Sequence, residues 1–83
     1  MNKMIIMQYV NKLKLDDIKR YCLNEGINIT NDESKLIYDY IKRDTLRILN
    51  NPMEVILEVE DKVSKEVYDK ILELYRQYKN KIS

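Results

Sequence analysis

Three acidic side chains form the arrangement in this sequence that comes nearest to a chemical site. Glu54, Glu58 and Asp61 are spaced i, i+4 and i+7, which places three carboxylates along one flank of a helix. Carboxylate oxygens are the ligands that Ca²⁺ and Mg²⁺ prefer. Because Lys62 and Lys65 follow in the same segment, we interpret the three acids as a solvated acidic face and expect no metal site.

The residue types on which most enzymes depend are scarce. The chain has no histidine and one cysteine, Cys22, so neither a Cys-His pair nor a structural zinc site can form within one chain. Ser34, Ser64 and Ser83 lie near helix starts or at the terminus, and the single glycine leaves no nucleophile elbow or phosphate loop. We therefore expect no catalytic residue, no cofactor and no enzyme activity. Cys22 is interpreted as a small buried hydrophobic residue.

Length and composition indicate a small helical protein. The chain of 83 residues has room for one domain, 35% of its residues are charged, and it holds one Gly and one Pro. Most of it should therefore be regular structure joined by short connections. A lone cysteine cannot form an internal disulfide, and the apolar run from Met4 to Met7 is too short for a signal sequence or a membrane span. We expect a cytoplasmic protein with no membrane partner.

The net charge of +1 is distributed unevenly. Residues 1–20 hold five Lys or Arg and two Asp, for a net charge of +3, whereas residues 54–66 hold two Lys and five acidic residues, for −3. Proteins that bind the phosphate backbone usually have a concentrated excess of positive charge. The balance of charge therefore argues against a dedicated nucleic-acid-binding protein.

Apolar residues recur at helical spacing along most of the chain. They predict helices over approximately 3–12, 16–25, 31–43 and 52–61, and from 65 onward, whereas 45–49 fits either an extended link or a continued helix. The residues expected to cap helix starts are Asp16, Thr30 with Glu33, Asn51 before Pro52, and Ser64. The residues expected to face inward are Ile5, Ile6, Tyr9, Val10, Leu13, Ile18, Tyr21, Cys22, Leu36, Ile37, Tyr40, Ile41, Met53, Ile56, Leu57, Val59, Val67, Tyr68, Ile71, Leu72, Leu74, Tyr75 and Tyr78.

The connection between the second and third predicted helices has its own pattern. Gly26 stands where a helix C-cap needs a left-handed residue. Ile27 and Ile29 alternate with Asn28, a pattern too short to form a sheet, so we expect an extended link whose isoleucines enter the core. The prediction is an all-α fold, a compact bundle of four or five short helices with one extended Ile-rich link, in one domain over residues 1–83.

Tyrosine supplies all the aromatic surface, with seven Tyr and no Phe or Trp. Tyr38 lies off the face formed by Ile37 and Ile41, and Tyr78 lies near the chain end. Exposed tyrosines are enriched at interfaces, so these two are candidates for contact with a protein partner or a second copy. The alternative is that both cover apolar surface at the edge of the core.

Residues 15–43 resemble the helix, extended turn, helix pattern of SAP- and LEM-type modules. The resemblance lies in Leu15, Ile18-Lys19, Leu23, Gly26-Ile27 and Lys35-Leu36-Ile37. It implies that the start of the second helix meets nucleic acid or a partner protein, although Asp32 and Glu33 there would oppose an approaching phosphate. The residues that would contact nucleic acid under this alternative are Lys12, Lys14, Lys19, Arg20, Lys42, Arg43 and Arg47.

Over its whole length the chain is similar to the YqfT-like proteins of Gram-positive bacteria. The segments "GINIT", "NNPME" and "VSKEV" fall where that family has an Ile-rich turn, an Asn-marked helix restart and a Ser or Thr cap. The chain departs from the family pattern at Arg43-Asp44-Thr45, where the family has a Gly-bearing loop. The resemblance implies a cytoplasmic helical protein of unknown function and supplies no active site.

Two functional hypotheses follow. The first is a non-catalytic protein-interaction or regulatory module that uses tyrosine-bearing helix faces. The second is a nucleic-acid-binding module. Binding that weakens steeply with added salt would favour the second, whereas binding that is indifferent to salt would favour the first.

Overall fold

The computed structural model describes residues 3–82 of the chain. All the regular secondary structure in this range is helical. The helices are α1 (Lys3–Lys12), α2 (Leu15–Asn24), α3 (Asn31–Arg43), α4 (Thr45–Asn50), α5 (Pro52–Val59) and α6 (Lys65–Ile82). The predicted all-α class is confirmed. The described residues contain one helix more than the largest number predicted, because residues 45–50 form a separate short helix.

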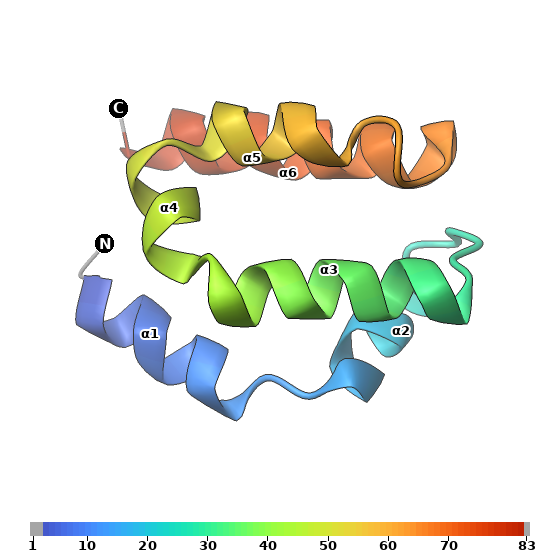
Figure 1. Ribbon diagram of the computed structural model, residues 1–83, viewed down its shortest axis with the longest axis horizontal. Coiled ribbons are helices and arrows are strands. Elements are labelled where there is room, and N and C mark those ends of the chain that lie inside the picture. Colours follow the sequence, from blue (N-terminus) through green and yellow to red (C-terminus); the bar gives the residue numbers. More distant parts are fainter. Residues whose placement is uncertain (1–2, 83) are drawn as a thin grey trace.

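The helices are arranged in two layers that α4 connects at one end (Figure 1). In the first layer α3 contacts α1 and α2, and in the second α5 contacts α6. Helices that pack directly have axes about 8–10 Å apart, yet within the described residues no helix of the first layer comes close in backbone to α5 or α6. The layers are therefore held apart over much of their length.

The end of α2 follows the prediction for Gly26. This residue has a φ of +71°, a conformation that glycine adopts at little cost. The backbone amide of Ile27 donates to the carbonyl of Cys22 at 2.8 Å, and that of Gly26 to the carbonyl of Leu23 at 3.1 Å. This pair of hydrogen bonds is the Schellman motif, and it turns the chain into the extended link that precedes α3.

Two of the four predicted caps are present as expected. The Thr30 hydroxyl accepts from the amide of Glu33 at 3.0 Å, and the Glu33 carboxylate accepts from the amide of Thr30 at 3.0 Å, which is a capping box. At the start of α6 the Ser64 hydroxyl accepts from the amide of Val67 at 3.2 Å. Both side chains satisfy amides that the first turn of a helix leaves unpaired.

The other two predicted caps are wrong. The second helix begins at Leu15, one residue before Asp16, and the Lys14 amide donates to Asp17 at 2.9 Å. Asp16 instead pairs with Arg20 one turn later.

At the start of α5, Pro52 occupies the first helical turn as predicted. The Asn51 side chain, however, forms no cap and donates to the Glu54 carboxylate at 3.0 Å. The reason is that Asn51 has φ −148° and ψ 68°, outside the extended backbone conformation from which an N-cap side chain accepts the amides of the first turn.

Few apolar side chains are fully enclosed. Within residues 4–80, whose burial the structure describes, the buried ones are Cys22, Val55, Ile56, Val59 and Val67. The burial of Cys22, Ile56 and Val67 confirms the prediction for these positions. Most other apolar residues of the inward faces are half-buried, because the layer opposite does not close over them.

The predicted inward stripe on α1 is partly wrong. Ile6, Val10 and Leu13 are half-buried as expected, but Ile5 is 47% and Tyr9 is 74% exposed. The reason is that α1 contacts α3 and α4 along one side, so one flank of its wide apolar stripe has no neighbour among the described helices.

Three further residues predicted to face inward are exposed. Tyr21 on α2 is 39% exposed, Leu57 on α5 is 58% exposed and Leu74 on α6 is 39% exposed. Leu57 follows Val55 and Ile56, both buried, and the helical turn carries it to the opposite side of α5.

None of the helices in residues 3–82 is long and apolar enough to cross a membrane.

Candidate functional site

A cavity of about 470 Å³ lies between the two layers and is partly open to solvent. We call it the apolar cleft, because almost all of the atoms exposed in it are apolar. An apolar cavity of about 150 Å³ stays dry and accommodates a benzene molecule, so the cleft has room for roughly three such rings. Its lining residues are Ile6, Ile37, Tyr40, Ile41, Ile48, Leu49, Pro52, Val55, Ile56, Val59, Ile71, Leu74, Tyr75 and Tyr78.

The Ile-rich link lies at the end of the molecule opposite α4 (Figure 1), and polar side chains join the two layers there. The Glu33 carboxylate accepts from the backbone amide of Ser64 at 2.6 Å. The backbone amide of Asn28 donates to the carboxylate of Glu66 at 2.7 Å. With α4 at one end and these hydrogen bonds at the other, the layers are spaced at both ends and the cleft lies between.

Glu33 serves both layers at once, and its pKa reflects this. Burial raises the pKa of its carboxyl, but the hydrogen bonds that it accepts from Thr30 and Ser64 outweigh burial and hold the pKa below its ordinary value. The carboxylate therefore stays ionised at neutral pH. The same group caps α3 and anchors the start of α6.

A salt bridge adds to this end of the molecule. The Lys70 ammonium lies 2.6 Å from the Glu25 carboxylate across the layers and 3.3 Å from Glu73 on its own helix. The hydrogen bond to Glu25 raises the pKa of Lys70 well above its ordinary value. Lys70 therefore keeps its charge at any physiological pH.

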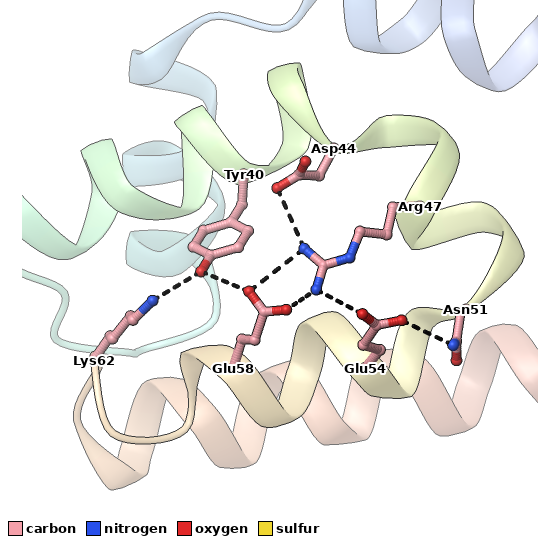
Figure 2. A network of polar contacts seen from close by, with 7 residues as sticks. All are labelled: Tyr40, Asp44, Arg47, Asn51, Glu54, Glu58 and Lys62. Atoms are coloured by element: carbon pink, nitrogen blue, oxygen red, sulfur yellow. Dashed lines mark hydrogen bonds and ion pairs between the residues drawn. The ribbon is translucent and has the colours of Figure 1, made fainter.

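Seven polar residues from α3, α4 and α5 and the segments beside them form a network at the side of the cleft (Figure 2). We call it the polar cluster. Arg47 is at its centre and faces three carboxylates, with contacts of 3.0 Å to Glu54 and 3.8 Å to Asp44 and an ion pair with Glu58. The members of the polar cluster are Tyr40, Asp44, Arg47, Asn51, Glu54, Glu58 and Lys62.

Tyr40 belongs to both sites. Its ring lines the apolar cleft, while its hydroxyl donates to Glu58 at 3.3 Å and accepts from the Lys62 ammonium at 3.0 Å. The hydrogen bond to Tyr40 raises the pKa of Lys62, and the hydrogen bond to Glu54 raises that of Arg47. Both cations are therefore fully charged at neutral pH.

A polar pocket of about 330 Å³ lies beside the polar cluster, lined by Leu36, Tyr40, Arg43, Asp44, Glu58 and Lys62. Three of its charged groups have partners: Asp44 and Glu58 contact Arg47, and Lys62 donates to Tyr40. Across residues 3–82 no group of three or more His, Cys, Asp and Glu residues is placed to hold a metal ion. The cluster thus binds together α3, α4 and α5 through its own charges.

The acidic face expected on the fourth predicted helix is partly wrong. Glu54 and Glu58 are not simply solvated, because both contact the Arg47 guanidinium. Asp61 lies beyond the end of α5 and is exposed. The Arg47 guanidinium is held between the two glutamates.

The two tyrosines singled out from the sequence lie in different surroundings. Tyr78 lines the apolar cleft at the α6 wall. Tyr38 does not line the cleft. The centroid of its ring lies 5.5 Å from the ammonium nitrogen of Lys42. The Lys42 ammonium in turn donates to the carbonyls of Val10 and Asn11 at the end of α1. Of the two tyrosines, Tyr78 therefore lies at the cleft and Tyr38 does not.

The seven basic residues of the nucleic-acid alternative are spread over four helices and a connection. Some have partners within the chain: Arg20 pairs with Asp16, Lys42 donates to α1, and Arg47 is at the centre of the polar cluster. Lys12, Lys14 and Arg43 are exposed, and Lys19 is half-buried. Within the described part of the chain, these seven residues are not seen to form one continuous basic surface.

Cys22 and Ser34 are enclosed near the Ile-rich link. Burial, followed by the nearby charge of Glu33, raises the pKa of the Cys22 thiol, which lowers its reactivity. The Ser34 side chain is fully buried and donates to the carbonyl of Thr30 at 3.0 Å. Both side chains therefore contribute to packing around the start of α3.

Sequence reasoning missed the polar cluster and the cleft. The signal for the cluster was present in part, because Asp44 and Arg47 are spaced i, i+3 and meet if residues 45–49, which fit either a link or a helix, are helical. The pairing of Arg47 with Glu54 and Glu58 depends on how α4 turns the chain, and helical spacing alone does not show this.

The fold and site define a two-layer, all-helical protein with an apolar cleft between the layers. The chain is 28% identical over 76 residues to the uncharacterized protein YqfT of Bacillus subtilis (strain 168), an alignment that covers 89% of this chain and 90% of that protein. The similarity to the YqfT-like proteins, expected from the sequence, is confirmed. No protein-family model and no solved structure matches the chain.

Proposed function

We propose that this protein is a non-catalytic, cytoplasmic protein-interaction module whose apolar cleft receives the apolar face of a helix from a protein partner. The observation that carries the proposal is the cleft itself, about 470 Å³ of apolar space between two helical layers whose described backbones do not come close to each other. Apolar grooves between helices are a recurrent means of binding amphipathic helices.

The free-energy cost of leaving such a space empty supports an occupant. At roughly 24 cal/mol per Å³, an empty closed cavity of this volume costs on the order of 10 kcal/mol, which is comparable to the whole stability of a small domain. The cleft is partly open, so the real cost is a fraction of this value. Filling it with apolar side chains would still stabilise the complex strongly.

The residues at the cleft favour a polypeptide as its occupant. Three tyrosines, Tyr40, Tyr75 and Tyr78, contribute to its lining, and tyrosine is enriched at protein interfaces because it offers a large apolar ring with a polar tip. Leu74 also lines the cleft and is 39% exposed, so it is accessible to a partner.

Photo-crosslinking tests the proposal. Leu74→Cys in a Cys22→Ser background, labelled with benzophenone maleimide and added to native extract, is expected to capture a polypeptide, which mass spectrometry identifies. Leu57→Cys in the same background is the matched control, because Leu57 is exposed and does not line the cleft. Equal amounts of captured polypeptide at both positions, or no capture from position 74, would contradict the proposal.

A further inference from the structure

We propose that the occupant of the apolar cleft is α1 of a second copy of this chain, docked reciprocally so that each copy fills the cleft of the other. This inference rests on the function proposed above, because it names the partner that the cleft receives. Three properties of the chain support it: its surface area, the uncovered flank of α1, and the distribution of charge.

The surface of the chain is larger than that of a compact monomer. Its accessible area is 6143 Å², whereas a compact monomeric protein of 10.1 kDa exposes about 5,300 Å². The difference of roughly 800 Å² is about what each partner contributes to a standard-sized interface. The radius of gyration of 12.4 Å also exceeds the value of about 11.8 Å expected for this length. The chain thus exposes the area that one dimer interface would cover.

The N-terminal helix has an apolar flank that nothing in the described chain covers. Ile6 and Val10 face inward, and Ile6 lines the cleft. Ile5 and Tyr9, spaced i, i+4, lie together on the adjoining flank and are 47% and 74% exposed. We call these two residues the α1 edge. A helix with apolar residues around most of its circumference is normally buried on more than one side.

Charge also distinguishes the two halves of the proposed contact. The segment 1–20, which contains α1, has a net charge of +3, and the segment 54–66, which contains most of α5, has a net charge of −3. Just after α5, which lines the cleft, Glu60 and Asp61 are exposed. A second copy docked in the cleft would bring its basic N-terminal segment toward these carboxylates, and opposite charges favour that orientation.

The position of α1 permits a closed, symmetric pair. Because Ile6 is part of the cleft lining, the α1 edge lies next to the cleft of its own chain. A twofold axis beside α1 would therefore place the α1 edge of each copy against the cleft of the other. The same two surfaces would then be used by both copies. The chain carries both parts that such an interface needs, an apolar groove and an apolar helix edge.

Sedimentation equilibrium over a wide range of concentrations tests the self-association. The full chain is expected to approach twice its monomer mass of 10.1 kDa. Tyr9→Glu is expected to remain monomeric with unchanged circular dichroism, because Tyr9 is exposed in the single chain. Leu23→Glu is the control, since Leu23 is 77% exposed on α2 and away from the cleft. A wild type that is monomeric throughout, or a Leu23→Glu chain that dissociates as fully as Tyr9→Glu, would overturn the inference.

Crosslinking between isotopically distinct copies tests the site of contact independently. Leu74→Cys with Cys22→Ser, carrying benzophenone maleimide, is mixed with the same protein labelled with nitrogen-15. Crosslinks that join light to heavy chains and map to residues 3–12 are expected. Crosslinks confined to one chain, or joined to another helix, would overturn the inference. A monomeric chain that captures a different polypeptide from extract would overturn self-association and leave the proposed function standing.

Discussion

Individual residues in this protein serve more than one purpose, and Tyr40 is the clearest case. Its ring is part of the apolar cleft while its hydroxyl is part of the polar cluster. The side chain therefore joins a dry surface to a charged one without leaving a buried polar atom unpaired. The two contributions can be separated by removing the hydroxyl alone or the whole ring.

Tyr40→Phe is expected to lower the free energy of unfolding by about 0.5–1.5 kcal/mol, the usual value for a lost hydrogen bond. Tyr40→Ala should lower it by about 2–4 kcal/mol because it also removes ring packing. In both variants the pKa of Lys62 should fall, since the hydrogen bond to Tyr40 is what raises it most. Urea denaturation and NMR titration of the Lys62 side chain measure these effects. Equal losses of stability in the two variants would show that the ring does not pack in the cleft.

Glu33 gives the second prediction for a single residue. Glu33→Gln should lower the free energy of unfolding by about 1–2 kcal/mol, because charged acceptors at helix starts make stronger hydrogen bonds than neutral ones. Since the folded pKa of Glu33 is below its ordinary value, its contribution is fully present above the unfolded pKa of about 4.3 and is lost as pH falls through the folded pKa.

The difference between wild type and Glu33→Gln should therefore shrink below about pH 4, as measured by thermal melts across pH. Asp32→Asn is the control, because Asp32 is an exposed acid in the same first turn and shares the favourable interaction with the helix dipole. A difference for Glu33→Gln that stays constant down to strongly acidic pH, or one matched by Asp32→Asn, would contradict the assigned role.

Among the elements, the turn between α2 and α3 shows how local geometry sets the layout. A left-handed glycine ends α2, the extended link follows, and a capping box begins α3. Asn28 and Glu33 then tie this segment to the start of α6. The link thus fixes the far end of the cleft, as α4 fixes the near end.

Gly26→Ala is expected to lower the free energy of unfolding by about 1 kcal/mol. The cause is backbone strain alone, because a Cβ at this position meets no atom within 4 Å. Gly26→Asn is the matched variant and should cost less, since asparagine tolerates the left-handed region better than alanine. Chemical denaturation of the three chains gives the order of stability. A stabilised Gly26→Ala chain would show that the turn relaxes to another conformation.

At the scale of the whole molecule, the sequence was sufficient to predict the features that depend on residues close to one another along the chain. Helical spacing, the Gly26 turn, the Thr30 capping box and the Pro52 restart were predictable because each depends on residues within a few positions. The separation of the layers was not, since it depends on how α4 turns the chain between Asp44 and Asn51. Ile5 and Tyr9 were consequently assigned to a core that does not cover them.

The under-packed interior leads to a prediction that compares two buried valines. Val55 lines the cleft and Val67 does not, although they are 6% and 3% exposed. Val67→Phe should lower the free energy of unfolding by about 1–3 kcal/mol, because added volume in a well-packed interior forces strain. Val55→Phe should cost nothing or stabilise the isolated chain by up to about 1 kcal/mol, because its ring can enter the cleft.

Filling the cleft should also compete with a second copy. Val55→Phe is therefore expected to leave the Tm of dilute protein unchanged or to raise it. In a self-associating chain the Tm increases with protein concentration, and Val55→Phe should make this increase smaller. Differential scanning calorimetry at several concentrations measures both effects. If Val55→Phe destabilised the chain as much as Val67→Phe, the interior around Val55 would be as tightly packed as that around Val67, and the cleft would have no room for the side chains of a partner.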